Sequence, residues 1–111
     1  MTVDSIRTRA RQILGDTVDP YRWGDGELRA HVQAAVRRLN ARVPATRYVG
    51  LAVQDCIELP AEDAADIPVD GRYEEALALY VAHLAYFNDA TDTVNAERAA
   101  SCLQRAEGMM V

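Results

Sequence analysis

The sequence predicts a single all-α domain, a compact four-helix bundle with an extended segment or short β-hairpin between the second and third helices. Four stretches carry apolar residues at spacings of three and four, which is the period of an α-helix. The stretch from residue 44 to residue 68 lacks that period. A length of 111 residues is typical of one domain, so residues 1–111 are expected to share one core.

The first helix is expected over residues 3–14. Its apolar residues recur at spacings of three and four: Val3, Ile6, Ala10, Ile13 and Leu14. Gly15 follows the last of them, at the position where a left-handed C-cap suits glycine. The arginines at positions 7, 9 and 11 are expected on the other faces, because a spacing of two does not keep them on one stripe.

The second helix is expected over residues 24–43 and ends before Pro44. It shows the strongest helical repeat in the chain, carried by Leu28, Val32, Val36, Leu39 and Val43. Asp25 is expected to be its N-cap. Glu27 falls in the first turn, where a carboxylate meets the positive end of the helix dipole.

The segment after Pro44 changes pattern and is expected to be extended or to form a short hairpin. Its apolar residues lack a helical repeat and are interrupted at Gly50: Tyr48, Val49, Leu51, Val53, Ile57 and Leu59. A third helix is expected from Asp70–Gly71 to Asn88. Its apolar side is expected to carry Tyr73, Leu77, Tyr80, Val81, Leu84 and Phe87.

The fourth helix is expected to run from residue 93 or 94 to Met109. Its buried side is expected to consist of Ala96, Ala99, Ala100, Leu103 and Ala106. The link between the third and fourth helices is short, so these two helices are expected to form an antiparallel hairpin.

Charge is distributed unevenly along the chain. All twelve basic residues are arginines, and the net charge is −5. Residues 1–50 carry nine arginines and five acids, a net charge of +4, while residues 51–111 carry three arginines and twelve acids, a net charge of −9. This asymmetry suits either head-to-tail packing of identical subunits or a simply solvated surface.

Residues able to carry out catalysis or to bind metal are sparse. His31 and His83 lie on different predicted helices without a partner at metal-ligand spacing, and no phosphate-binding glycine loop or nucleophile elbow is present. We therefore expect no enzyme and no cofactor. Cys56 and Cys102 are expected to be reduced and to act as small apolar residues.

The overall composition also argues against two classes of partner. The chain has no run of eighteen apolar residues, and an acid lies at position 4, so we expect a soluble, unexported protein that enters no membrane. A net charge of −5 repels phosphates at long range, so sequence-specific DNA binding is not expected.

Two motifs resemble the head-tail adaptor proteins of tailed bacteriophages. Pro20 to Leu28 resembles the start of the second helix in that family, which often reads Tyr-x-Trp-Ser/Thr-Asp-x-Glu-Leu. The matching residues, called here the entry motif, are Tyr21, Trp23, Asp25, Glu27 and Leu28. Gly24 departs from the usual Ser or Thr. The second match, called here the C-terminal motif, comprises Tyr80, Ala85, Tyr86, Asp89, Ala90, Asn95, Arg98 and Ala99.

The resemblance implies a structural virion protein that is made in the host cytoplasm and lies at the neck of the particle. Family members form a ring with neighbouring adaptor subunits, usually of twelve copies, that docks beneath the portal protein. A tail or stopper protein attaches below, and DNA passes through the channel without sequence-specific binding. The alternatives are another neck component, such as a stopper or tail-completion protein, and a small cytoplasmic helical regulator.

Three groups of residues are expected to matter for that role. The channel wall is expected to carry carboxylates that keep DNA from sticking, with a solvated outer loop as the alternative; these are Asp55, Glu58, Glu62, Asp63, Asp66, Asp70, Glu74 and Glu75. Met109, Met110 and Val111 are expected to be surplus to the core and to dock on the portal. Trp23 is expected to pack at the entry to the second helix.

Overall fold

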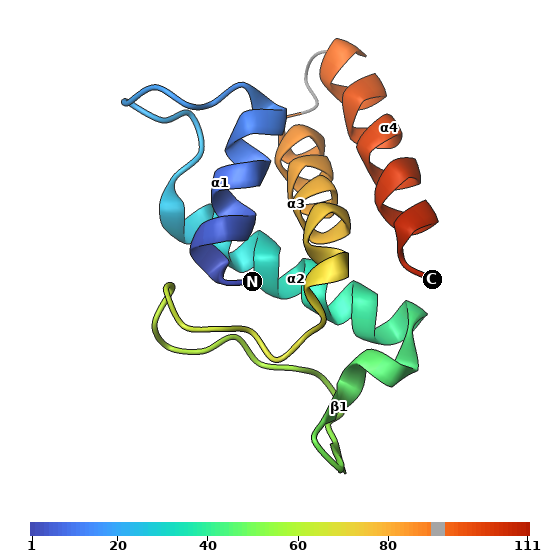
Figure 1. Ribbon diagram of the computed structural model, residues 1–111. Coiled ribbons are helices and arrows are strands. Elements are labelled where there is room, and N and C mark those ends of the chain that lie inside the picture. Colours follow the sequence, from blue (N-terminus) through green and yellow to red (C-terminus); the bar gives the residue numbers. More distant parts are fainter. Residues whose placement is uncertain (90–92) are drawn as a thin grey trace.

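The computed structural model describes residues 1–89 and 93–111 (Figure 1). These residues form four α-helices: α1 (Val3–Leu14), α2 (Asp25–Arg42), α3 (Glu74–Asn88) and α4 (Thr93–Met109). They also form a two-stranded hairpin, β1 (Tyr48–Val49) and β2 (Ala52–Val53), and 3-10 turns at Pro44–Arg47 and Gly71–Tyr73. The structure is compact, mostly helical and consistent with the expected bundle, although the hairpin means that it is not strictly all-α.

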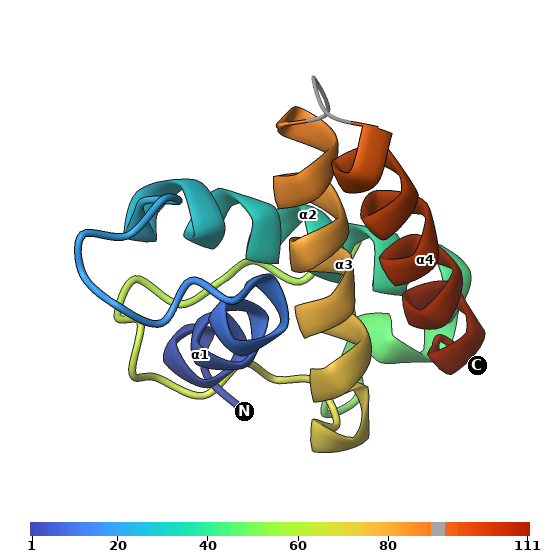
Figure 2. The same cartoon turned by 90° about the horizontal axis from the view of Figure 1, so that it is seen from above.

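Helix α3 lies at the centre of the molecule. Helices α1, α2 and α4 all pack against it (Figure 2). A helix surrounded in this way needs apolar residues on several faces, and Leu79, Ala82 and Ala85 are buried in addition to the expected Leu77 and Val81. The expectation for Phe87 was wrong: it lies at the end of α3 and is 63% exposed.

Helix α1 begins and ends where the sequence predicted. Thr2 and Ser5 form a reciprocal capping box at its N-terminus, and Gly15 caps its C-terminus in the left-handed conformation with a φ of 71°. Its apolar face is buried. Arg11, which the spacing placed on another face, is also buried.

Helix α2 starts differently from the prediction. Gly24, not Asp25, occupies the N-cap and makes no side-chain capping bond. Asp25 is the first helical residue, and its carboxylate accepts a hydrogen bond from Arg11 instead of capping the helix. The expectation that Asp25 caps α2 was therefore wrong, because Asp25 already belongs to the helix and its carboxylate is bonded to Arg11 of α1.

The segment between α2 and α3 is fastened to α2 by side chains that bond its backbone. Asn40 is buried and accepts a hydrogen bond from the Ile57 N–H at 2.9 Å. Gln33 accepts from the Leu59 N–H at 3.0 Å and donates to the Ile57 carbonyl at 3.1 Å. These bonds satisfy backbone groups that no helix or sheet pairs, and they hold Ile57 in the core.

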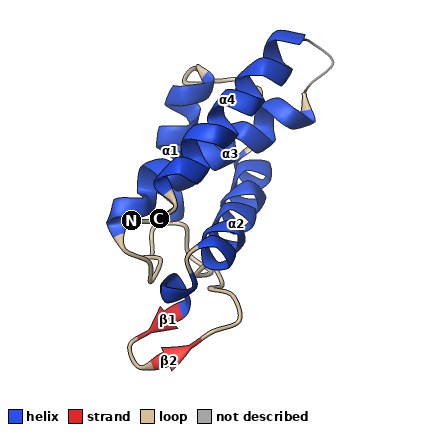
Figure 3. Ribbon diagram, turned by 90° about the vertical axis from the view of Figure 1, so that its right-hand side faces the viewer, coloured by secondary structure: helices blue, strands red, loops and turns tan. Residues whose placement is uncertain are grey.

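The hairpin projects from the helical body (Figure 3). Tyr48 pairs with Val53, and Gly50 turns the chain with a φ of 62°. Both strands are exposed throughout, and the Leu51 side chain is fully exposed at the tip. The expected hairpin is present, and its apolar residues lie outside the core.

Helix α4 packs antiparallel to α3 and buries a narrower stripe than expected. Ala99 and Ala106 are buried as expected, together with Cys102. Ala96 and Ala100 are exposed, so the expectation for them was wrong. Alanines occur on several faces of α4, and their spacing alone does not show which face meets α3.

Candidate functional site

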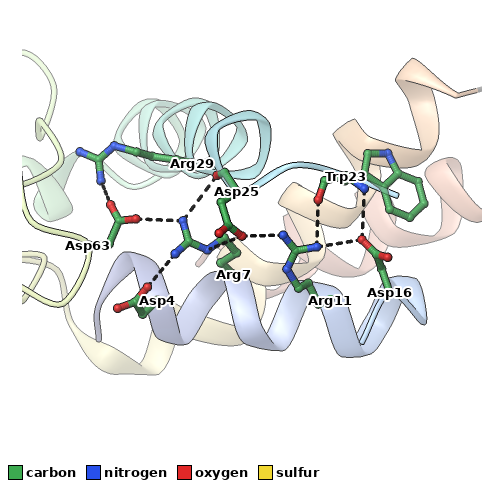
Figure 4. Close-up of polar contacts among 8 residues, drawn as sticks. All are labelled: Asp4, Arg7, Arg11, Asp16, Trp23, Asp25, Arg29 and Asp63. Atoms are coloured by element: carbon green, nitrogen blue, oxygen red, sulfur yellow. Dashed lines mark hydrogen bonds and ion pairs between the residues drawn. The ribbon is translucent and has the colours of Figure 1, made fainter. Parts of the chain in front are cut away.

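Arginine and aspartate side chains connect α1 to the loop that leads into α2 (Figure 4). Arg11 lies at the centre of this network. Its guanidinium donates to Asp16 at 2.8 Å, to the Trp23 carbonyl at 2.9 Å and to Asp25 at 2.7 Å. Arg11 and Asp16 are both buried, so their ion pair is shielded from water.

Asp16 organises the backbone of the same loop. Its carboxylate accepts hydrogen bonds from the N–H groups of Arg22 at 2.9 Å and Trp23 at 3.2 Å. Together with the bond from Arg11, these contacts satisfy a buried carboxylate that would otherwise be costly. The loop is therefore shaped around Asp16, a residue that the sequence analysis did not single out.

The network continues into the segment between α2 and α3. Arg7 donates to Asp4 at 2.7 Å and to Asp63 at 2.9 Å, and Arg29 also pairs with Asp63. The hydrogen bond from Arg7 holds the pKa of Asp63 below its ordinary value against the opposing effect of burial, and Arg29 contributes in the same direction as Arg7. Asp63 thus joins α1, α2 and the acidic segment.

The residues of the entry motif lie around this network. Trp23 is buried, as expected, and meets Tyr86 edge-on with ring centroids 6.2 Å apart. The Tyr21 ring lies under the Arg11 guanidinium at 3.8 Å. Leu28 is fully buried, while Glu27 is exposed on the first turn of α2. Tyr21, Trp23 and Asp25 therefore lie at the joint between α1 and α2, whereas Leu28 belongs to the main core and Glu27 lies near His31 of its own helix.

The structure divides the acidic residues expected to line a channel into two sets. Asp63 is paired with arginines, Asp66 with the N-terminal amine at 3.0 Å, and Glu75 with Arg9 at 2.8 Å. The hydrogen bond from Arg9 lowers the pKa of Glu75. Glu74 lies 3.4 Å from the Ser5 hydroxyl. The exposed members without an ion pair in the described part of the chain are Asp55, Glu58, Glu62 and Asp70.

The three C-terminal residues do not behave as one surface. Met109 is 44% exposed and Val111 is 81% exposed. Met110 is buried in the main core beside residues of α1, α2 and α3, and the Val111 carbonyl accepts a hydrogen bond from the Tyr73 hydroxyl at 2.9 Å. The expectation that all three are surplus to the core was therefore wrong for Met110, because the chain turns inward after α4.

The histidines and cysteines lie apart from one another. The His31 Nε2 is 3.8 Å from Glu27, and burial lowers the pKa of His31. His83 contacts the Ala99 carbonyl at 2.9 Å. Cys56 and Cys102 are free thiols, and burial raises the pKa of Cys102. Among residues 1–89 and 93–111, no group of three His, Cys, Asp or Glu side chains is placed to hold a metal ion.

Three further findings complete the description. No helix of the described residues is long and apolar enough to span a membrane. Ala90, which belongs to the C-terminal motif, lies outside the described residues. Comparisons of the chain with models of protein families, with curated proteins and with solved structures found no match.

Proposed function

We propose that this protein is a non-enzymatic assembly protein, one subunit of a head-tail adaptor ring of about twelve copies that docks beneath the portal of a tailed phage. One observation carries the proposal: the entry motif and the C-terminal motif, far apart in sequence, meet in space. Trp23 packs edge-on against Tyr86, and Arg22, which lies between the motif residues Tyr21 and Trp23, pairs with Asp89. Asp89 also accepts a hydrogen bond from Asn95 at 3.2 Å. The two segments that carry the resemblance are therefore in contact in the folded chain.

The exposed surfaces support a role in assembly. A ring subunit must contact the portal above, its neighbours at the sides and a tail or stopper protein below. Large exposed apolar patches mark such contacts. The hairpin presents Tyr48, Leu51 and Val53, with exposed fractions of 56%, 103% and 55%. Met109 and Val111 supply a second exposed apolar surface at the C-terminus, and they dock on the portal in this proposal.

In the same proposal, the channel wall takes its charge mainly from the exposed carboxylates that form no ion pair with another described residue. These are Asp55, Glu58, Glu62 and Asp70, while the paired Asp63, Asp66 and Glu75 contribute less. Carboxylates that face the DNA leave its counterions in place and so prevent tight binding during packaging and ejection. A reconstruction of the neck with these carboxylates on the outer surface would contradict this assignment.

The test of the proposed function is the composition and structure of purified virions. Mass spectrometry of particles is expected to find the protein, and microscopy of the neck is expected to place it in a ring in direct contact with the portal. If microscopy instead places the protein below the ring that contacts the portal, the protein is a stopper or tail-completion protein. Absence from purified particles would favour the small cytoplasmic regulator.

A further inference from the structure

A groove of about 480 Å³ lies between the C-terminal end of α1 and helix α4, with Tyr86 of α3 also lining it, and we call it the α4 groove. Ile13, Leu14 and the buried Cys102 give it an apolar floor, and Arg98 and Arg105 border it. The two arginines are seven residues apart on α4, about 10 Å along the helix. Both guanidinium groups are therefore able to reach one carboxylate held between them.

Within residues 1–89 and 93–111, the arginines of the α4 groove have no acidic partner of their own. Neither Arg98 nor Arg105 forms an ion pair with another described residue, whereas Arg7, Arg9 and Arg11 all do. Arg98 lies near the Tyr86 ring at 5.9 Å, and Arg105 reaches Glu75 only at longer range. In a chain with a net charge of −5, two cations at the edge of an apolar groove indicate an acidic ligand.

The loop between α1 and α2 offers a segment with the complementary chemistry. Val18 is 78% exposed, and the neighbouring Asp19 is exposed without an ion pair or hydrogen bond to the described residues. In both Figure 1 and Figure 2 this loop extends from the side of the molecule opposite α4. One copy of the chain therefore carries an acidic, apolar tip that extends away from α4 and a separate basic, apolar groove beside α4.

We propose that the Val18–Asp19 tip of one copy binds the α4 groove of a second copy. Val18 covers the apolar floor, and the Asp19 carboxylate lies between Arg98 and Arg105, which bind carboxylates through their planar forks. The contact joins two different surfaces, so it repeats head to tail and closes into a ring when the rotation between copies allows closure. This inference rests on the proposed function in so far as the contact becomes the lateral contact of the adaptor ring.

A charge exchange tests the contact with the purified chain alone. The first variant is Asp19→Arg, and the second is Arg98→Glu with Arg105→Glu; all three side chains are exposed. Sedimentation equilibrium of the unaltered protein at high concentration and low ionic strength is expected to show association that salt weakens. Each variant alone is expected to raise the dissociation constant about tenfold or more, because like charges then meet.

The decisive sample is the equimolar mixture of the two variants. In the mixture, the basic tip meets an acidic groove and the unaltered tip meets an unaltered groove, so association is expected to return. Glu97→Arg, which reverses an exposed charge on α4 outside the groove, is the matched control and is expected to leave association unchanged. A mixture that remains as weakly associated as its components, or an unaltered protein that never associates, would overturn the proposal.

A carbodiimide cross-link supplies a second readout that does not depend on tight association. The chain contains no lysine, so Arg98→Lys introduces a single side-chain amine. Between isotope-labelled and unlabelled copies, the new amine is expected to couple to Asp19. Coupling only to other carboxylates would contradict the contact. Neither assay contains portal protein, so the contact and the adaptor role are tested separately. If the copies associate through this contact but the protein is absent from virions, the contact stands and the adaptor role is refuted. If the protein lies in the neck but the copies do not associate in this way, the adaptor role stands and the contact is refuted.

Discussion

The buried ion pair between Arg11 and Asp16 fixes the start of α2. A buried guanidinium is tolerated only when it is paired and its remaining donors are hydrogen-bonded. Arg11 meets this condition because Asp16, the Trp23 carbonyl and Asp25 accept bonds from it. The spacing of the arginines on α1 did not reveal this role, because the three acceptors come from the loop after α1 and the first residue of α2, whose positions depend on the folded structure.

We predict that Arg11→Ala destabilises the protein by about 3–5 kcal/mol, because it leaves the Asp16 carboxylate buried without its cation. The matched control is Arg22→Ala, which removes a more exposed partner of Asp89 and is expected to cost less than about 1 kcal/mol. Urea denaturation followed by circular dichroism measures both. Equal losses for the two variants would show that the burial of the Arg11 pair has no special energetic role.

We predict that the free energy of unfolding decreases in two steps as the pH is lowered from neutral. The pKa of His31 lies below its ordinary value of 6.5, because burial outweighs the attraction of Glu27. The unfolded chain therefore takes up this proton at a higher pH than the folded chain, and stability falls as pH drops from about 6.5. The pKa values of Asp63 and Glu75 lie below 3.8 and 4.5, so their ion pairs stabilise the fold above those values and lose their effect as pH falls further.

The variant His31→Gln separates the two steps. It removes the proton that the unfolded chain binds first, so its stability is expected to stay level from neutral pH to about pH 5 and to fall only when the carboxylates titrate. Denaturation curves recorded at a series of pH values provide the measurement. An unchanged pH profile in this variant would exclude His31 as the cause of the upper step.

At the scale of single elements, some features are determined by the local sequence and others by contacts with the rest of the fold. The bounds of α1 were predictable because its apolar repeat and Gly15 are local features of the sequence. The buried side of α4 was not predictable in full, since alanines lie on several of its faces and only the position of α3 selects Cys102 over Ala100. The same holds for Met110, whose burial depends on a turn of the chain beyond α4.

We predict that Met110→Ala destabilises the protein by about 2–5 kcal/mol, since Met110 is 2% exposed and fills space in the main core. Met109→Ala is the matched control and is expected to change stability by about 0.5 kcal/mol or less, because Met109 is 44% exposed. Thermal and chemical denaturation of both variants give the comparison. If Met109→Ala proves the more destabilising change, Met109 and not Met110 is the residue that is buried in the core.

At the scale of the whole molecule, many arginines of the basic half form ion pairs with carboxylates of the acidic half of the same chain. Arg7, Arg9 and Arg38 of the basic half pair with Asp63, Glu75 and Glu107 of the acidic half. The sequence shows that the two halves differ in charge, but it does not show whether they meet within one chain or between copies. Among the candidate site residues, Trp23 packs at the entry to α2 as expected, whereas the paired state of Asp63 and Glu75 required the folded structure.

In the contact proposed between copies, the signs of charge are the reverse of the net charges of the two halves of the sequence. It takes its carboxylate, Asp19, from the basic half and its arginines, Arg98 and Arg105, from the acidic half. A charge that is already paired within a chain adds little binding energy to a contact with a neighbour, because breaking the existing ion pair costs about as much free energy as forming the new one releases. Unpaired charges are therefore a better guide to an interface here than the net charge of each half.

We predict that the purified protein is a monomer at about 10 μM and associates only at much higher concentration or on the portal. Each helix already buries its apolar stripe within one core, and the Val18–Asp19 contact is too small to offset the lost freedom of association by itself. On the portal, docking holds neighbouring copies at a high effective concentration, so the same weak contact suffices to complete a ring. Sedimentation velocity with and without portal rings measures the difference, and a closed twelve-subunit ring of the isolated protein at micromolar concentration would contradict the prediction.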